Sequence, residues 1–175
     1  MLSLARPTLA AGEVAAACLS AAGTTRPPRG DRLARLAERL NTTETFTATL
    51  AGARIEAFAS TVIFMRDAGE TARGGLQAVQ LKANTPSVWD GRFEVTAPAP
   101  ATVAPLKGHA SRLPPKEREA LKAVPAAARP ALPILITAGG LTCPLLAAAP
   151  TASVRALALE RFRAAVGFIE CEGDL

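Results

Sequence analysis

The stretch from Thr24 to Leu40, TTRPPRGDRLARLAERL, concentrates the side chains of this sequence that are best suited to binding chemistry. Its arginines stand at five positions: Arg26, Arg29, Arg32, Arg35 and Arg39. Within the stretch, Asp31 and Glu38 oppose their charge. Because a guanidinium group is planar and always charged, it can donate two parallel hydrogen bonds to a phosphate. The stretch is therefore either a contact surface for a polyanion or an ordinary solvated helix face.

Helical spacing places four of these arginines along one edge of an expected helix. Asp31 is expected to cap that helix, because its carboxylate can accept hydrogen bonds from the free amides of the first turn. Leu33, Leu36 and Leu40 recur at the spacing of one buried face. With 3.6 residues per turn, the side chains of four arginines fall within about a third of the circumference, beside that face: Arg29, Arg32, Arg35 and Arg39. Their charged ends would then point outward from the edge of the protein body.

The overall charge also favours an anionic partner. The 175-residue chain has 20 basic and 15 acidic residues, a net charge of +5 and a pI of about 9.7. Such a balance suits nucleic acid or an acidic membrane surface. Arginine outnumbers lysine sixteen to four, however, and alanine is abundant, which is also typical of a GC-rich coding bias. The composition therefore permits phosphate binding without requiring it.

The sequence contains no pattern of catalytic or metal-binding residues. There is no G-x-x-x-x-G-K-[ST] loop, no G-x-G-x-x-G between a strand and a helix, and no serine in a G-x-S-x-G elbow. Cys18, Cys143 and Cys171 are far apart, and His109 is the one histidine, which is too sparse a set for a zinc site of ordinary spacing. We predict no catalytic residue, no metal site and no cofactor in this chain, with the cysteines as reduced, buried apolar side chains.

The N-terminus bears a faint likeness to a signal peptide. Pro7 and Glu13 interrupt its apolar run, and Arg6 alone supplies basic charge before that run. No stretch approaches the roughly 18 uncharged apolar residues that a membrane span requires. We therefore expect a soluble, cytoplasmic protein without a membrane partner.

Hydrophobic periodicity predicts an α+β fold. Helices are expected at 13–22, at 31–40 and after Pro114-Pro115, and strands at 45–50, 53–58, 61–66, 102–108 and 134–137, with a hairpin over 87–97 that turns at Asp90-Gly91. The Gly-rich segment 67–76 is expected to be a mobile loop, and the tail is either a final helix or a helix with a short strand. These elements predict an N-terminal helical segment followed by a small antiparallel or mixed β-sheet with helices packed on it. We divide the chain into a helical region at 1–42 and an α+β region at 43–175.

Four stretches of the sequence resemble tRNA(Ile)-lysidine synthetases, in particular those of the alphaproteobacterial type. They are RPPRGDRLARL (26–36), FTATLAGARIEA (46–57), VWDGRFEV (88–95) and LKGHASRLPPKEREALKAVPAAARPALPIL (106–135). In that family, an N-terminal ATP-pyrophosphatase domain with an S-G-G-x-D-S loop adenylates the wobble cytidine of tRNA(Ile), and lysine then displaces AMP. This chain has no such loop and resembles the parts that follow it, a helical linker at 1–42 and a C-terminal α+β domain at 43–175.

The resemblance implies that this chain is not catalytic by itself and helps to position tRNA(Ile). It also implies that the arginines of the stretch at 26–39 and of the WDGRF turn contact RNA. These residues are Arg26, Arg29, Arg32, Arg35, Arg39 and Arg92. An inward salt bridge or a role in stabilising the turn is an equal alternative for Arg92, and Trp89 is expected in the core. ATP and magnesium would belong to the full enzyme, which has an N-terminal domain that is separate or missing here. The alternative is a basic module that binds another RNA, or a structural domain, unrelated to lysidine synthesis.

Overall fold

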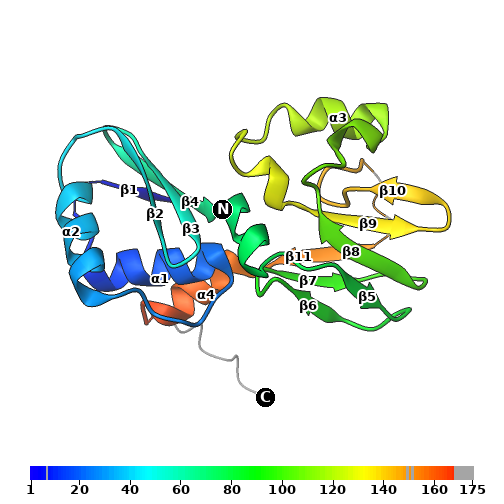
Figure 1. Ribbon diagram of the computed structural model, residues 1–175, viewed down its shortest axis with the longest axis horizontal. Helices are drawn as coiled ribbons and strands as arrows, with labels where there is room; N and C mark the ends of the chain where they lie inside the picture. Colours follow the sequence, from blue (N-terminus) through cyan, green and yellow to red (C-terminus); the bar gives the residue numbers. More distant parts are fainter. Residues whose placement is uncertain (7, 149, 151, 168–175) are drawn as a thin grey trace, which may run out of the picture. The chain divides into compact units, whose positions relative to one another are not determined.

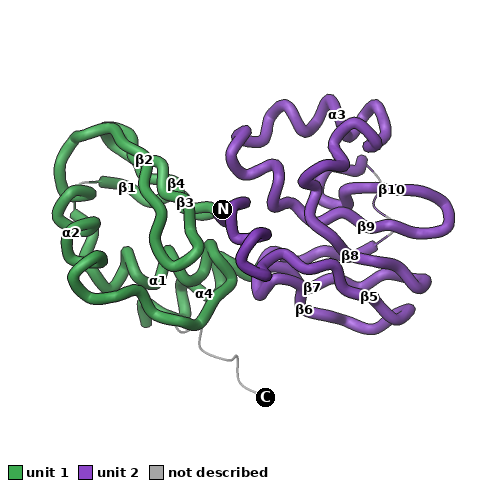
Figure 2. The backbone as a smooth tube through the Cα atoms, in the orientation of Figure 1, with its two compact units in different colours: residues 1–65, 157–175 green, residues 66–156 purple. Residues whose placement is uncertain are grey.

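The computed structural model describes residues 1–6, 8–148, 150 and 152–167, and its chain divides into two compact units. Unit 1 comprises Met1–Met65 and Leu157–Leu175, and unit 2 comprises Arg66–Ala156 (Figure 2). Helices and antiparallel sheets are both present, so the predicted α+β class is confirmed. The predicted division at residue 42 remains a prediction about domain organisation. In the structure, the helices of 1–42 share unit 1 with the strands that follow them.

Unit 1 contains a four-stranded sheet with helices packed against it (Figure 1). The strand order is β1-β4-β3-β2, with β1 at Leu2–Ala5, β2 at Phe46–Leu50, β3 at Ala53–Ala57 and β4 at Thr61–Arg66. The period-two pattern correctly predicted β2, β3 and β4, and Phe46 and Leu50 of β2 are buried. The turn between β2 and β3 has positive φ angles at Ala51 and Gly52. The pattern did not predict β1, because its four residues give too short an alternation.

The helices of unit 1 bury small side chains. They are α1 at Ala11–Ala22, α2 at Gly30–Leu40 and α4 at Ala158–Ala165. Val14, Cys18 and Ala21 of α1 lie in one core with residues of α2, α4 and the sheet. Small residues let backbones approach closely, and α1 and α4 lie alongside each other (Figure 1). As predicted, α1 ends at Gly23, which adopts φ 70° and donates its amide to Leu19 O.

Unit 2 contains two further sheets instead of an extension of the first. One has the order β10-β9-β8-β5, with β5 at Val79–Leu81, β8 at Ala101–Pro105, β9 at Pro133–Thr137 and β10 at Gly140–Thr142. The other has the order β11-β7-β6, with β6 at Ser87–Trp89, β7 at Phe93–Thr96 and β11 at Ser153–Ala156. The predicted hairpin turns at Asp90-Gly91, both with positive φ. The tail forms a strand and a helix, the second of the two predicted alternatives. The prediction of a single sheet was wrong, because periodicity identifies strands but not the partners with which they pair.

Segment 67–76 was expected to be a loop, but it contains the 3₁₀ helix η1 at Ala68–Arg73. The Asp67 carboxylate accepts a hydrogen bond from the Gly69 amide at 3.0 Å, and Gly74 ends the turn with φ 83°. The remaining helical elements of unit 2 are η2 at Ala110–Arg112, α3 at Pro115–Leu121 and η3 at Arg129–Ala131. The expectation of a loop failed because glycine and polar residues also cap short 3₁₀ turns.

Candidate nucleic-acid interface

Helix α2 begins at Gly30, with Arg29 at its N-cap position, two residues before the N-cap expected at Asp31. Arg29 occupies the N-cap position with extended φ and ψ, and no side chain caps the helix. The predicted capping by Asp31 was therefore wrong. Asp31 instead lies in the first turn, where its carboxylate is favourably placed near the positive end of the helix and also pairs with an arginine one turn on. The predicted apolar face is confirmed, since Leu36 and Leu40 are buried in the unit 1 core.

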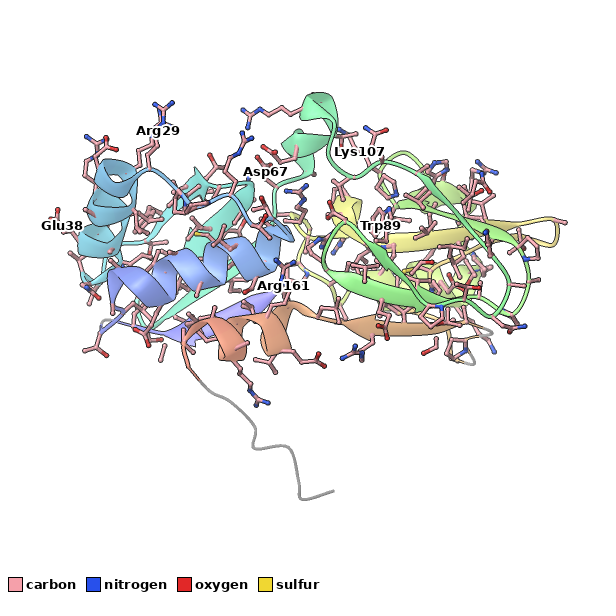
Figure 3. All side chains as sticks on the ribbon, turned by 90° about the horizontal axis from the view of Figure 1, so that it is seen from below. Arg29, Glu38, Asp67, Trp89, Lys107 and Arg161 are labelled. Carbon is pink, nitrogen blue, oxygen red and sulfur yellow. The ribbon has the colours of Figure 1, made fainter. Side chains whose placement is uncertain are left out.

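Three of the predicted contact residues lie at the N-terminal side of α2 and are exposed: Arg26, Arg29 and Arg32. In the described part of the chain, no hydrogen bond or ion pair engages their guanidinium groups. Figure 3 shows the Arg29 side chain extended away from the ribbon. These three arginines, which we call the cationic helix end, can donate to an external ligand without breaking an internal contact.

Arg35 forms an exposed ion pair with Asp31. The distance between Nη2 and Oδ2 is 3.2 Å, and the side chains are 71% and 69% exposed. Pairs of this kind on a helix surface contribute about 0.3–0.5 kcal/mol, because both groups remain well hydrated. A phosphate can therefore replace the Asp31 carboxylate as the partner of Arg35 at little energetic cost.

Arg39 is held much more firmly than the other four arginines. Its Nε donates to Oε2 of Glu44 at 2.9 Å and its Nη2 to Oε1 at 2.5 Å. Its guanidinium also lies over the Phe46 ring, 3.9 Å from the centroid. The hydrogen bonds raise the pKa of Arg39 and lower the pKa of the Glu44 carboxyl. The arginine stripe predicted from the sequence is thus divided into a free end, an exchangeable pair and a fixed end.

The fixed end of α2 rests on Arg6, which sequence reasoning had treated as a terminal charge. Its side chain is 7% exposed and donates to five carbonyl oxygens. These belong to Leu40 at 2.7 Å, Glu44 at 2.8 Å, Phe58 at 2.5 Å, Arg39 at 3.1 Å and Thr42 at 2.5 Å. No motif could have revealed this role, because every partner is a backbone atom at least 33 residues away. Arg6 joins the end of α2 to the turn between β3 and β4.

Arg92, the sixth predicted contact, lies inside unit 2 and is 6% exposed. Its Nε donates to Asp90 at 2.6 Å, and its Nη2 donates to Ala131 O at 2.7 Å. Arg66 donates to the other oxygen of Asp90 at 3.0 Å. Burial lowers the pKa of Arg92, and the Asp90 carboxylate opposes that shift. These contacts are those of the alternative interpretation, the inward salt bridge.

Trp89 is a core residue, as expected. Its side chain is 1% exposed, and its indole nitrogen donates to Gln77 O at 2.8 Å. The ring stacks with Phe93 at a centroid distance of 6.2 Å. Trp89 and the buried Arg92 together stabilise the hairpin turn and present no open ring for a base.

A thinner group of cations lies around α3 in unit 2: Lys107, Arg112, Lys116 and Arg118. Of these, Lys116 lines a pocket of about 470 Å³, together with Pro114, Pro115, Glu117, Ala147 and Ala148. The Glu117 carboxylate is buried and accepts from the Thr142 hydroxyl and the Cys143 amide, at 2.5 and 2.6 Å. Glu117 thus stabilises the fold and does not supply a reactive group to the pocket.

The two thiols within the described residues are buried and unpaired. Burial raises the pKa of Cys18 to about 12 and the pKa of Cys143 to about 11. Both therefore stay protonated at neutral pH, which agrees with the predicted apolar role. Cys171 lies outside the described residues.

Two other kinds of site are absent from the described part of the chain. No three side chains among its His, Cys, Asp and Glu residues are grouped so that they could hold a metal ion. None of its helices is long and apolar enough to cross a membrane.

These observations define a class: an α+β protein in which a helix presents free arginines at one end and is locked into the core at the other. A comparison with known proteins identifies a relative of this chain. The chain is 50% identical over 167 residues to the tRNA(Ile)-lysidine synthase of Caulobacter vibrioides, which confirms the resemblance seen in the sequence. The match covers 91% of this chain but 41% of that relative, so this chain is similar to a part of such a protein. No family model and no solved structure matches the chain.

Proposed function

We propose that this chain is the C-terminal, tRNA-binding portion of a tRNA(Ile)-lysidine synthetase and is not catalytic by itself. The observation that carries the proposal is the cationic helix end, in a chain that is 50% identical to part of a lysidine synthase. The 50% sequence identity supports a relationship to the lysidine synthetases. The three free guanidinium groups supply the chemistry with which a protein holds the phosphates of an RNA.

The geometry of α2 suits a phosphate backbone. Arg29 at the N-cap and Arg32 in the first turn are separated by almost one helical turn, and Arg26 lies in the non-helical segment that leads into α2. The uncapped amides of the first turn add partial positive charge at the same end. Arg35 can join this surface by exchanging Asp31 for a phosphate. Arg39 keeps the far end of the helix in place through Glu44 and Phe46.

Contacts of this kind position an RNA without reading its sequence. The cationic helix end therefore supplies affinity and register, and the choice of tRNA(Ile) lies in other contacts of the whole enzyme. In this proposal, adenylation with ATP and magnesium and the attack by lysine take place on an N-terminal domain outside this chain, in the cytoplasm. The residues of this chain hold the tRNA body while that chemistry proceeds.

The test is a salt series of binding to tRNA(Ile) and to a non-cognate tRNA. We expect Arg26→Gln, Arg29→Gln and Arg32→Gln together to reduce the slope of log K against log salt concentration by about 2–3 units, because each lost phosphate contact removes about one released counterion. A matched variant removes three exposed cations from unit 2: Arg73→Gln, Lys82→Gln and Lys122→Gln. It should leave the slope nearly unchanged.

Three outcomes would contradict parts of the proposal. Equal slopes for the two triple variants would mean that only total charge matters, and α2 would lose its role. Failure of the folded chain to bind tRNA would favour a structural domain. Tight binding of ATP by this chain would contradict the assignment of catalysis to another domain.

A further inference from the structure

A second feature of unit 1, the aromatic ring of Phe58, has no role in the phosphate contacts described above. Phe58 follows β3 and is 44% exposed, whereas Phe46, Phe64, Trp89 and Phe93 are buried. A single exposed apolar side chain is common in proteins and needs no explanation by itself. What distinguishes Phe58 is the way its backbone is held and what it is held against.

Both backbone polar groups of Phe58, its amide and its carbonyl, form hydrogen bonds. Its amide donates to Thr61 O at 2.8 Å across the tight turn between β3 and β4, and its carbonyl oxygen accepts from Nη1 of Arg6. The Arg6 side chain is itself buried and held by five hydrogen bonds. An aromatic ring on so constrained a backbone is presented to a ligand with little further loss of conformational entropy on binding.

Arg6 also determines what lies beside Phe58. The same Nη1 atom that donates to Phe58 O donates to Glu44 O, and Nη2 donates to Arg39 O at the end of α2. One guanidinium group therefore holds the Phe58 turn against the C-terminal end of the helix whose other end carries the free arginines. The intervening Thr42 and Thr43 are exposed and polar. The free arginines of the cationic helix end and the exposed ring of Phe58 thus belong to the same compact unit.

We propose that Phe58 stacks against an unpaired nucleobase of the RNA whose phosphates the cationic helix end binds. This inference rests on the proposed function and adds a specific contact to it. Aromatic rings bind unpaired bases through their faces, with a sequence-tolerant contribution of about 1–3 kcal/mol per base. A base in a paired helix is stacked on both sides and cannot use such a ring. Phe58 lies beside the C-terminal end of α2 and the free arginines lie at its N-terminal end, about 16 Å of helix away, so the proposal requires an RNA whose unpaired base lies at such a distance from the phosphates that the arginines hold.

The experiment compares Phe58→Leu, Phe58→Trp and the wild-type chain. Each is titrated with tRNA, with tRNA lacking its unpaired 3′ end, and with a fully paired RNA duplex of similar length. Leu159→Ala, which trims another exposed apolar side chain of unit 1, is the matched control. Thermal unfolding should be similar for all four proteins, since neither side chain belongs to the buried core.

We expect Phe58→Leu to weaken tRNA binding roughly 5- to 150-fold, which is the fold-change that corresponds to one lost base stack. Its salt slope and its affinity for the duplex should match the wild type, and Phe58→Trp and Leu159→Ala should bind tRNA normally. The indole introduced by Phe58→Trp should be quenched by tRNA and not by the duplex. The buried Trp89 of the wild type gives the reference signal. A defect that disappears with the shortened tRNA identifies the base as one of the 3′ end, and a defect that persists identifies a loop base.

Two results separate failure of this inference from failure of the proposed function. If Phe58→Leu binds tRNA as tightly as the wild type while the arginine variants still lose salt dependence, the stacking contact is refuted and the tRNA-binding role stands. Equal loss of tRNA and duplex binding by Phe58→Leu would also refute stacking. If the wild-type chain does not bind tRNA, both proposals fall together.

Discussion

Replacing Arg6 by alanine should destabilise unit 1 far more than replacing any arginine of the cationic helix end. The Arg6 guanidinium is buried and donates to five carbonyl oxygens, which come from α2, the segment after it and the β3–β4 turn. Its removal leaves these oxygens facing a cavity without a donor. The segments that they belong to are far apart in the sequence, so no local hydrogen bond replaces what is lost.

The expected loss in the free energy of unfolding is about 3–5 kcal/mol. A hydrogen bond from a charged donor contributes about 1.5–3 kcal/mol by itself, but bonds made by one group are not additive. A buried carbonyl oxygen left without a donor costs about 1–3 kcal/mol, and because five such costs at one site do not add, we expect a total of about 3–5 kcal/mol. Arg6→Lys should lie between alanine and the wild type, because an ammonium group keeps the charge but has three donors in place of five.

Urea unfolding followed by circular dichroism measures this loss, with Arg32→Ala as the matched control. Arg32 is exposed and has no partner among the described residues, so its variant should change stability by about 0.5 kcal/mol or less. Tryptophan fluorescence gives a separate signal from unit 2, because Trp89 is the one tryptophan of the sequence. A loss below about 1 kcal/mol for Arg6→Ala would refute the assignment of Arg6 as the residue that holds α2.

Three further predictions test contacts elsewhere in the chain. Asp90→Asn removes the carboxylate shared by two buried guanidinium groups and should cost about 3–5 kcal/mol in urea unfolding; a loss below about 1 kcal/mol would mean that other partners neutralise them. Because Arg39 lowers the pKa of Glu44, their pair should stabilise the fold above the unfolded carboxyl pKa and lose that effect as pH falls through the folded pKa. An NMR titration of Glu44 should then show a midpoint below the usual range, and Arg39→Gln should restore it. Cys18 should resist alkylation at pH 8 until the chain is unfolded, since burial raises its pKa to about 12; rapid labelling of Cys18 itself in the folded chain, located by peptide mass spectrometry, would contradict that burial.

Local patterns correctly predicted the elements that have strong local signals. The alternation around Phe46 and the Asp90-Gly91 turn placed β2 and the second hairpin, because side-chain period and positive φ are properties of a few adjacent residues. Short elements such as β1 and β5 were missed. Their three or four residues form strands because a partner strand lies beside them, and sequence alone does not supply that partner.

The sequence predicted which residues make up the candidate site, but not which of them are free and which are engaged in internal contacts. The sequence indicated a row of arginines beside an apolar helix face, and the structure shows that row on α2. Whether an arginine is free of internal contacts depends on whether the fold places a carboxylate or carbonyl oxygen of another segment within hydrogen-bonding distance of it. Glu44 and Phe46 engage Arg39, and Asp90 engages Arg92.

By itself, the sequence therefore determined the fold class, the positions of most helices and strands, the amphipathic arginine helix and the resemblance to lysidine synthetases. All of these follow from residue types and spacings within short windows, or from similarity along the chain. The tertiary structure alone decided that the strands of the described residues form three sheets, that Arg6 holds the end of α2, and that Phe58 is exposed while Trp89 is buried. Those outcomes depend on contacts between residues tens of positions apart, where backbone carbonyls and buried surfaces select partners that no local pattern specifies.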